Sequence, residues 1–212
     1  MKKVYVVGEA KYYASFIKNC KLVDDIKKAD IVMFTGGEDV DPSLYGVEKY
    51  YKTYSNLDRD LYEKSVFEQI KPNQLVVGIC RGSQFLCVMN GGMLIQHVEG
   101  HAMFGTHGIM NEKSLEYEIT STHHQMQYPY NLNDNDYDIL YWSADRRSDV
   151  YCVDGINEDE MLEEVEPEIV LYHKDNMPKC LAIQGHPEYM RKDAPVVKML
   201  NTLINKLLKE LK

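Results

Sequence analysis

Cysteine is scarce in this chain, and the few cysteines are not arranged in pairs. Five occur among 212 residues, at positions 20, 80, 87, 152 and 180, and none belongs to a Cys-x-x-Cys motif. An odd and unpaired set of this kind does not support a disulfide framework or a structural zinc site. We therefore expect a protein of the reducing cytoplasm.

Basic runs and long apolar runs are also missing. Lys and Arg total 24 against 33 Asp and Glu, which gives a formal net charge of −9, and no basic run is present that would neutralise a phosphate backbone. Nucleic acid and anionic membranes are therefore not expected as partners. The apolar run that begins at Val4 is interrupted at Gly8-Glu9, too early for a signal peptide, and no run approaches the length of a membrane span.

No Pro- or Ser-rich linker and no internal repeat divides the chain, so residues 1–212 are expected to form a single domain. In its first part, short apolar runs alternate with stretches of helical spacing. Strands are expected at 4–7, 31–34 and 76–79, and helices around 12–17 and over 56–70. This alternation predicts an α/β fold, a three-layer flavodoxin-like sandwich with a mostly parallel central sheet. Active sites of such sheets lie at the carboxyl ends of the strands.

The second half of the chain is less regular. Residues 91–112 contain five glycines and three histidines, with little apolar periodicity, and predict a loop. A C-terminal helix with a broad apolar stripe is expected to begin near Asp193 and Pro195. Between these segments, short strands are expected at 117–120, 139–142, 169–172 and 180–183.

The most informative stretch is Gly78-Ile79-Cys80-Arg81-Gly82, which follows an apolar run and precedes helix-compatible spacing. A strand, a tight turn and a helix with a thiol at the apex form a nucleophile elbow. The flanking glycines leave room for a strained backbone at Cys80. The free N–H groups at the helix start, that of Arg81 first, would favour a thiolate and an adjacent oxyanion. The alternative is a small buried cysteine in a structural turn.

A second group of polar residues follows the apolar run at 180–183. A cysteine nucleophile needs a base, usually an imidazole that is oriented by a carboxylate or an amide. Residues two apart in an extended segment point the same way, so one loop can place His186 near Cys80 with Glu188 behind it. For His186 considered alone, the alternative is a structural histidine at a strand end.

His97 and His101 are four residues apart, as in zinc proteases, but the rest of that motif is missing. Val98 stands where the motif needs glutamate, and Gly100 disfavours an unbroken helix. We expect neither a metal site nor a cofactor. Cys87 is expected to be a buried core residue on the same helical face as Cys80.

Taken together, the elbow, the late His-Pro-Glu and the early Thr-Gly-Gly resemble the class I glutamine amidotransferase superfamily, in which Cys, His and Glu form a catalytic triad. Further stretches, in the right order from about residue 31 to residue 190, are similar to the γ-glutamyl hydrolase branch. They are Thr35–Gly46, Arg59-Asp60 with Glu63, Gly91-Gly92 with Gln96-His97, and Ser121–Gln125. The segment before Thr35 is shorter than in that branch, which suggests a trimmed first βα unit.

The resemblance implies a role for each matching residue. Cys80 would attack the γ-carbonyl carbon, His186 would shuttle the proton, and Glu188 would orient His186. The backbone N–H groups of Gly37 and Arg81 would stabilise the oxyanion. Four residues match positions that contact the glutamyl group in the superfamily, namely Gln84, His123, His124 and Gln125.

Three functions follow from this resemblance. The first is a free-standing γ-glutamyl hydrolase that cleaves a small-molecule γ-glutamyl amide through a γ-glutamyl thioester. The second is a glutaminase subunit that takes glutamine and delivers ammonia to a separate synthetase partner. The third is a binding protein that keeps the pocket without turnover, which the intact Cys80, His186 and Glu188 disfavour.

Overall fold

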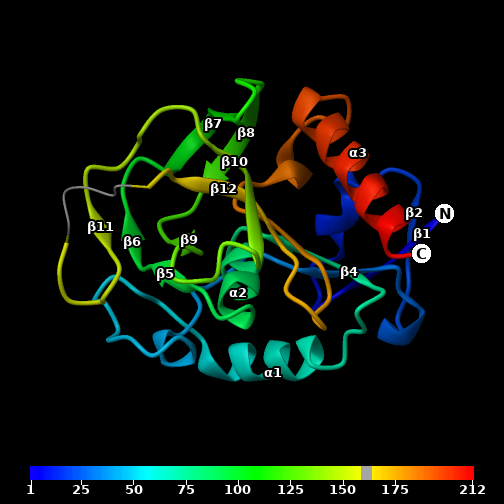
Figure 1. Cartoon of the computed structure of the whole chain (residues 1–212), viewed down its shortest axis with the longest axis horizontal. Coiled ribbons are helices and arrows are strands. Elements are labelled where there is room, and N and C mark those ends of the chain that lie inside the picture. The colour runs from blue at the N-terminus through cyan, green and yellow to red at the C-terminus, as the bar shows by residue number, and fades with distance from the viewer. Residues whose placement is uncertain (159–163) are drawn as a thin grey trace.

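The computed structural model describes residues 1–158 and 164–212, with the backbone alone at 103 and 104. The strands of its main sheet are β1 (Lys2–Val6), β2 (Cys20–Leu22), β3 (Ile31–Phe34), β4 (Leu75–Ile79), β7 (Ala102–Met110), β8 (Glu116–Thr122), β10 (Tyr137–Ser143), β12 (Pro167–Tyr172) and β13 (Cys180–Ile183). They lie in the order β2-β1-β3-β4-β13-β12-β10-β7-β8 (Figure 1). Two small sheets pair β5 (Met93–Ile95) with β9 (Met126–Tyr128) and β6 (His97–Val98) with β11 (Tyr151–Cys152).

The α/β fold with a parallel core is confirmed. Strands β2, β1, β3, β4 and β13 pair in parallel. The remaining pairs, from β13–β12 to β7–β8, are antiparallel, so the parallel arrangement ends at β13. Strand β13 therefore joins the two halves of the sheet. Its pairing sets Ile183 opposite Ile79, which brings the residues that follow these two strands to the same edge.

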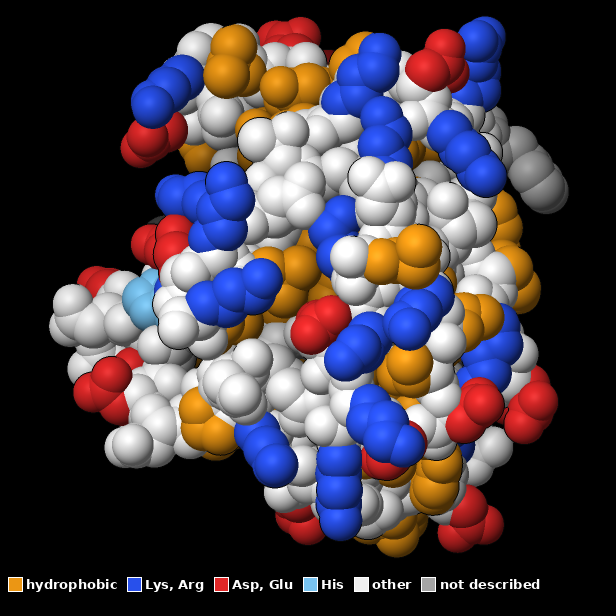
Figure 2. Space-filling view, turned by 90° about the vertical axis from the view of Figure 1, so that its right-hand side faces the viewer, with side chains coloured by type: hydrophobic (Ala, Val, Ile, Leu, Met, Phe, Trp, Pro, Cys, Tyr) orange, Lys and Arg blue, Asp and Glu red, His pale blue; other side chains and the backbone are white. Residues whose placement is uncertain are grey.

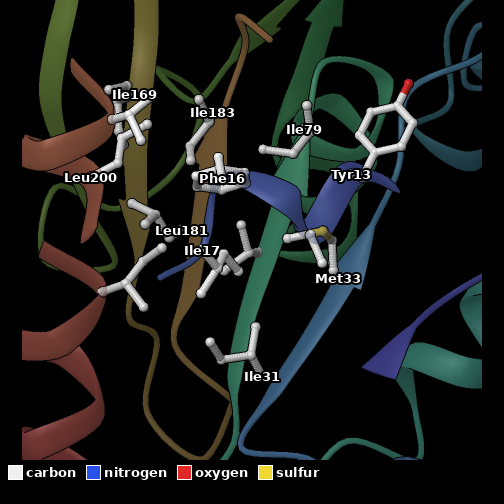
Figure 3. Packing of buried hydrophobic residues seen from close by; sticks show 14 of the residues in the cluster. Tyr13, Phe16, Ile17, Ile31, Met33, Ile79, Ile169, Leu181, Ile183 and Leu200 are labelled. Atoms are coloured by element: carbon white, nitrogen blue, oxygen red, sulfur yellow. The ribbon is translucent and has the colours of Figure 1, made fainter. Parts of the chain in front are cut away.

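The helices form the outer two layers. On one face, α3 (Pro195–Glu210) and the 3₁₀ helix η1 (Lys11–Phe16) pack on the sheet. Figure 3 shows Phe16, Ile17 and Leu200 from this layer beside strand residues such as Leu181 and Ile183. On the other face lie α1 (Leu57–Phe67) and α2 (Arg81–Met89), at the bottom and centre of Figure 1.

Each face of the sheet has its own apolar cluster because side chains alternate along a strand. Within β4, Leu75, Val77 and Ile79 belong to the cluster under α3, whereas Val76 belongs to the cluster under α1 and α2. All four are fully buried, as expected for a strand covered on both faces.

The outer surface is polar over the face that carries the two chain ends. Figure 2 shows Lys and Arg side chains spread across this face, with apolar side chains between them. No helix among the described residues is long and apolar enough to cross a membrane.

The first crossover differs from the expected helix at 12–17. Residues 11–16 form only the 3₁₀ helix η1, and a short edge strand, β2, and a second 3₁₀ helix, η2 (Ile26–Lys28), follow before β3. The expectation of an α-helical crossover is therefore wrong, although β1 and β3 do pair in parallel. Tyr13 and Phe16 are still buried in the core. The apolar spacing of this segment therefore indicated which side chains are buried, but it did not indicate an α-helix. Further 3₁₀ turns are η3 (Pro42–Leu44) and η4 (Pro187–Tyr189).

The loop expected over residues 91–112 is also wrong, because β5, β6 and the nine-residue β7 lie there. Strand β7 pairs with β8 at Ala102 and from Thr106 to Met110, with a register shift between them. The apolar pattern of this strand is interrupted by His107, which is buried against a carboxylate. The His107 Nε2 atom lies 2.8 Å from Glu168 Oε1. Pairing with a neighbouring strand, rather than apolar periodicity, makes this segment a strand.

Gly82 lies where helix α2 approaches β3, and we expect an alanine there to destabilise the fold. A Cβ at this position would lie 2.7 Å from the backbone carbonyl carbon of Phe34, which cannot move aside as a side-chain tip could. Gly82→Ala should lower the free energy of unfolding by about 1–3 kcal/mol in urea titrations. The control is Ser65→Ala on the exposed surface of α1, which should change it by less than about 0.5 kcal/mol. Equal losses in the two variants would contradict this packing argument.

Candidate active site

Cys80 lies at a strained turn between β4 and α2. Its φ and ψ angles are +53° and −113°, a region that residues with a Cβ rarely adopt, at a cost of order 1–3 kcal/mol. The turn is held because the Cys80 N–H donates to the carbonyl of Ile183 at 2.8 Å. The Cys80 carbonyl in turn accepts hydrogen bonds from the amide and hydroxyl of Ser83, at 2.9 and 2.7 Å. The strand, turn and helix thus occur where the sequence predicts them.

His186 follows β13 and is held on several sides. Its Nδ1 atom lies 2.6 Å from Glu188 Oε1, and its ring stacks on Tyr189 with the centroids 4.9 Å apart. The His186 amide donates to the carbonyl of Thr120 at 3.0 Å, and the Thr120 hydroxyl donates to the His186 carbonyl at 2.6 Å. The imidazole therefore has one fixed orientation.

The same surroundings favour the charged form of His186. Burial by itself lowers the pKa of His186, but hydrogen bonds and charge interactions with Cys80 and Glu188 outweigh burial and raise it to about 10. A protonated imidazole next to a thiol favours the thiolate, which is the nucleophilic form. The structure thus brings together the three residues that were predicted to form a triad.

A pocket of about 170 Å³ opens beside Cys80. The other residues expected at the site all line it, namely Gly37, Arg81, Gln84, His123, His124 and Gln125. Gly37 has a φ of +142°, and a Cβ there would collide with the guanidinium of Arg59, so the position requires glycine. Gly37 and Arg81 therefore lie on the wall of the same pocket as Cys80.

The polar side chains along one wall are largely engaged with each other. Gln84 Nε2 donates to the carbonyl of Gln125 at 2.8 Å, and Gln125 Nε2 donates to the Thr53 hydroxyl at 3.1 Å. His123 is turned towards the protein interior, where its Nδ1 atom lies 2.8 Å from the Gln125 carbonyl oxygen and burial lowers its pKa to about 4. These three residues shape the wall, and their hydrogen-bonding groups are not all free for a substrate.

The acidic side of the pocket was not expected from the sequence. Glu38, Asp39 and Tyr54 also line it. Asp39 Oδ1 lies 3.1 Å from His124 Nε2, and Asp39 Oδ2 accepts the amide of Tyr54 at 2.8 Å. Asp39 belongs to the glycine-rich stretch at 35–46 that carried the resemblance, whereas no pattern in the sequence points to Tyr54.

Two arginines beneath the pocket tie its parts to helix α1. The Arg81 guanidinium is buried and pairs with Asp60 and Glu63. Arg59 pairs with Glu63 at 2.9 Å and donates to the carbonyl of Gly36 at 3.0 Å. The residues Arg59, Asp60 and Glu63, noted in the sequence, therefore connect the elbow at Cys80 and the loop after β3 to helix α1.

Comparison with known proteins points to one family. A family model described as Peptidase C26 matches residues 17–188. The chain is 38% identical over 73 residues to Protein NtpR of Enterococcus hirae, which is 34% of this chain and 30% of that protein. It is 31% identical over 118 residues to a putative glutamine amidotransferase-like protein, the YvdE homolog of Lactococcus lactis subsp. cremoris, covering 46% of this chain and 63% of that one. The alignments thus span less than two thirds of either relative.

Solved structures share the fold at low sequence identity. A putative GMP synthase protein from Thermoplasma acidophilum matches with a TM-score of 0.61 and 18% identity, covering 99% of this chain and 95% of that one. PurLQS from Thermotoga maritima matches with a TM-score of 0.57 and 17% identity, covering 100% of both chains. At these identities, the likeness is one of fold.

Cys80 should be the first thiol to react with iodoacetamide at neutral pH, because it lines the pocket and contacts the raised-pKa imidazole. Cys87 and Cys180 are fully buried, and burial raises the pKa of both thiols to about 12. Peptide mass spectrometry over a time course measures the order, in a Cys20→Ala background that removes the partly exposed thiol. Modification of Cys87 before Cys80 would contradict the assignment.

The raised pKa of His186 should appear in the pH dependence of stability. The folded state binds this proton more tightly than the unfolded state, whose pKa is near 6.5, so the stabilisation is complete below about pH 6.5 and is lost as pH rises towards about 10. The difference in free energy of unfolding between the wild type and His186→Gln should fall across this window, by at most about 1.4 kcal/mol per pH unit.

Denaturant titrations at several pH values measure this difference. Cys80→Ala serves as a matched check, because loss of the thiol removes one cause of the raised pKa and should move the fall in stability to lower pH. If the difference in free energy of unfolding stays constant from pH 6.5 to pH 10, the pKa of His186 is not raised as expected.

Proposed function

Because the chain belongs to the peptidase C26 family, whose members are class I glutamine amidotransferase-like, we propose that it is a cysteine-dependent hydrolase of γ-glutamyl amide bonds. One observation carries this proposal: a cysteine at a strained elbow contacts a histidine that a buried carboxylate orients. Such a set supports nucleophilic catalysis with a γ-glutamyl thioester intermediate.

The first half of the reaction forms the thioester. The Cys80 thiolate attacks the γ-carbonyl carbon, and the carbonyl oxygen becomes an oxyanion. The amides of Gly37 and Arg81 donate to this oxyanion, each for about 3 kcal/mol of transition-state stabilisation. When the C–N bond breaks, the leaving amine takes a proton from the His186 imidazolium, and the glutamyl group stays on the sulfur.

The second half releases glutamate. Neutral His186 takes a proton from a water molecule, whose oxygen attacks the thioester carbonyl carbon. The C–S bond then breaks, and Cys80 leaves as a thiolate beside the reprotonated His186. Glu188 keeps its hydrogen bond with His186 Nδ1 throughout and holds the ring in one orientation.

The charges of the pocket support an amino-acid substrate. Glu38 and Asp39 place two carboxylates at the wall, which suits the α-ammonium group of a glutamyl moiety. A pocket of about 170 Å³ holds a small group. The leaving amine would therefore extend past the rim towards the loop at 38–46. We therefore propose a free-standing γ-glutamyl hydrolase that accepts amines larger than ammonia.

A second function is supported by the solved structures with this fold. Two of them are named as a GMP synthase protein and as PurLQS, and these names suggest glutaminase chains that work with a synthetase. In that role, this chain would hydrolyse glutamine and pass ammonia to a synthetase partner. A binding role without turnover has least support, because the triad residues are intact. The odd number of cysteines and the lack of a Cys-x-x-Cys motif support a reducing, cytoplasmic setting for each of these functions.

Steady-state assays of the isolated chain distinguish these functions. Glutamate release is measured from glutamine and from a panel of γ-glutamyl amines that differ in the size of the leaving amine. The hydrolase should act alone, with a higher kcat/KM for the larger amines, because the amine contacts the rim in the transition state. Cys80→Ala should reduce the rate by about 10⁴-fold or more.

Two other results would each support a different function. Inactivity on every conjugate, with glutamine hydrolysis only after a synthetase is added, would replace the hydrolase with the partnered glutaminase. Binding of a γ-glutamyl amide with no turnover under either condition would indicate the binding protein.

A further inference from the structure

A second cluster of ionisable side chains is buried behind the pocket wall, and the proposed reaction uses none of their charges. It consists of His101, His107, His123, Glu166 and Glu168, which are all at most 4% exposed. They come from the residue before β7, β7 itself, the loop after β8, the residue before β12, and β12. Two carboxylates and three imidazoles in the interior are costly unless each charge is compensated.

Three members of this cluster present ligand atoms to a common point. One ligand atom from each of His101, His123 and Glu168 lies within 4.8 Å of the others. The separations from Glu168 Oε1 are 3.4 Å to His101 Nδ1 and 3.8 Å to His123 Nε2. Among the described residues, His101 Nδ1, His123 Nε2 and Glu168 Oε2 have no hydrogen-bond partner.

The other nitrogen of each of these two histidines has a partner. His101 Nε2 lies 3.2 Å from Glu166 Oε2, and His123 Nδ1 lies 2.8 Å from the Gln125 carbonyl oxygen. A carboxylate and a carbonyl can only accept hydrogen bonds, so these outer nitrogens carry the protons. With a metal ion bound, the inner nitrogens would direct their lone pairs towards it, and a proton held on His101 Nδ1 between the two carboxylates would be displaced. Metal-binding histidines are oriented in this way by carboxylates and backbone carbonyls.

The carboxylates are themselves held in place. Glu166 accepts hydrogen bonds from the Tyr151 hydroxyl at 2.7 Å and from the Ser148 amide at 3.0 Å, so its position is independent of His101. His107 Nε2 lies 2.8 Å from Glu168 Oε1 and orients that carboxylate. These contacts form an outer layer around the three inner ligand atoms.

The two buried carboxylates need a compensating positive charge, which is either a proton on His101 or a metal ion between the inner ligand atoms. We propose that Zn²⁺ binds at this point, held by His101 Nδ1, His123 Nε2 and a carboxylate oxygen of Glu168. Two imidazoles and one carboxylate form a ligand set that Zn²⁺ accepts at about 2.0–2.2 Å, with ligand atoms roughly 3.3–3.5 Å apart in a tetrahedron. The spacings of 3.4 and 3.8 Å need a small contraction, and all three ligand atoms lie within 4.8 Å of one another.

This site differs from the spacing motif considered in the sequence. His97 does not belong to it, and its ring stacks on Tyr50 instead, with the centroids 5.7 Å apart. His101 and His123 are separated by strands β7 and β8, and Glu168 lies in β12. No local spacing predicts such a set, which is why no metal site was expected.

The ion would position the substrate pocket rather than take part in the reaction. His101 and Glu168 are fully buried and His123 is 2% exposed, so the ion would lie behind the wall of the substrate pocket. Through His123, it would fix the carbonyl of Gln125, which also accepts the hydrogen bond from Gln84. Zinc would therefore join the residue before β7, strand β12 and the 123–125 wall of the pocket into one unit.

Metal binding by the full chain tests this proposal without any need for turnover. All measurements use a Cys80→Ala background, which removes the nucleophile as a competing zinc ligand. The chain is stripped with a chelator and titrated with Co²⁺, and the visible absorption of a tetrahedral cobalt site is followed. We expect saturation at one equivalent, loss of the bands when Zn²⁺ is added, and a higher Tm with Zn²⁺ than with chelator.

Variants locate the site. His123→Ala should weaken Zn²⁺ binding by at least about a hundredfold, since loss of an outer-layer partner alone costs 10–100-fold. The matched control, His97→Gln, should bind as the parent does. If His123→Ala fails to fold, the Co²⁺ stoichiometry and absorption spectrum of the parent and of His97→Gln still test the proposal.

Absence of a one-equivalent cobalt spectrum in the folded parent would overturn the proposal. The cluster would then be neutralised by a proton on His101, between Glu166 and Glu168. Binding that survives in folded His123→Ala, or that is lost in His97→Gln, would also overturn it. Because each readout is made on an inactive chain, these outcomes are independent of whether the proposed hydrolase activity is found.

Discussion

The buried guanidinium of Arg81 is the interaction on which the candidate active site depends. It pairs with Asp60 and Glu63, and all three side chains are at most 4% exposed. Removal of one partner from such a group leaves an uncompensated buried charge, at a cost of about 3–5 kcal/mol. The pairs fasten the first turn of α2, where Cys80 and the Arg81 amide lie, to helix α1. Asp60 also accepts the amide of Asp41 at 2.8 Å, which ties the glycine-rich loop to the same helix.

Strand β13 provides the second constraint, because the parallel half of the sheet meets the antiparallel half there. On one side it pairs with β4, so the chain leaves both strands at the same edge and His186 comes close to Cys80. On the other side it pairs with β12, and the Gln184 amide donates to the carbonyl of Glu168 at 2.8 Å. The candidate triad residues and Glu168 of the buried histidine cluster therefore lie on or after adjacent strands, and a change in the register of β13 would disturb both.

The pocket wall is prepared by hydrogen bonds within the protein. Gln84 is held by the carbonyl of Gln125, Gln125 by Thr53, and Thr53 donates to Gln96 at 2.9 Å. This chain of polar side chains links α2 to the segment between the glycine-rich loop and α1. A wall that is already ordered loses little conformational entropy when a ligand binds, which favours affinity and a defined orientation. Residues that resemblance alone assigns to substrate contact thus also serve to shape the site.

The sequence by itself was enough to predict the features that depend on residues close together in the chain. The strands at 31–34 and 180–183 have the predicted bounds, and the strand–turn–helix at Cys80 lies where the glycines indicated it. The spacing of two between His186 and Glu188 also suffices to bring their side chains into contact. The strands and the elbow follow from local backbone geometry and from the alternation of side chains along a strand, whereas Pro187–Tyr189 form the 3₁₀ helix η4 rather than the extended segment expected after His186.

Only the tertiary structure decided the features that depend on pairing between distant segments. Residues 102–110 form strand β7 because β8 supplies hydrogen-bond partners, although their own pattern is that of a loop. Glu168 stands in a strand that is otherwise apolar, and its role becomes visible only when His101, His107 and His123 are brought around it from other strands and loops. A buried polar group is stabilised by its partners in space, and sequence periodicity carries no information about partners that lie tens of residues away.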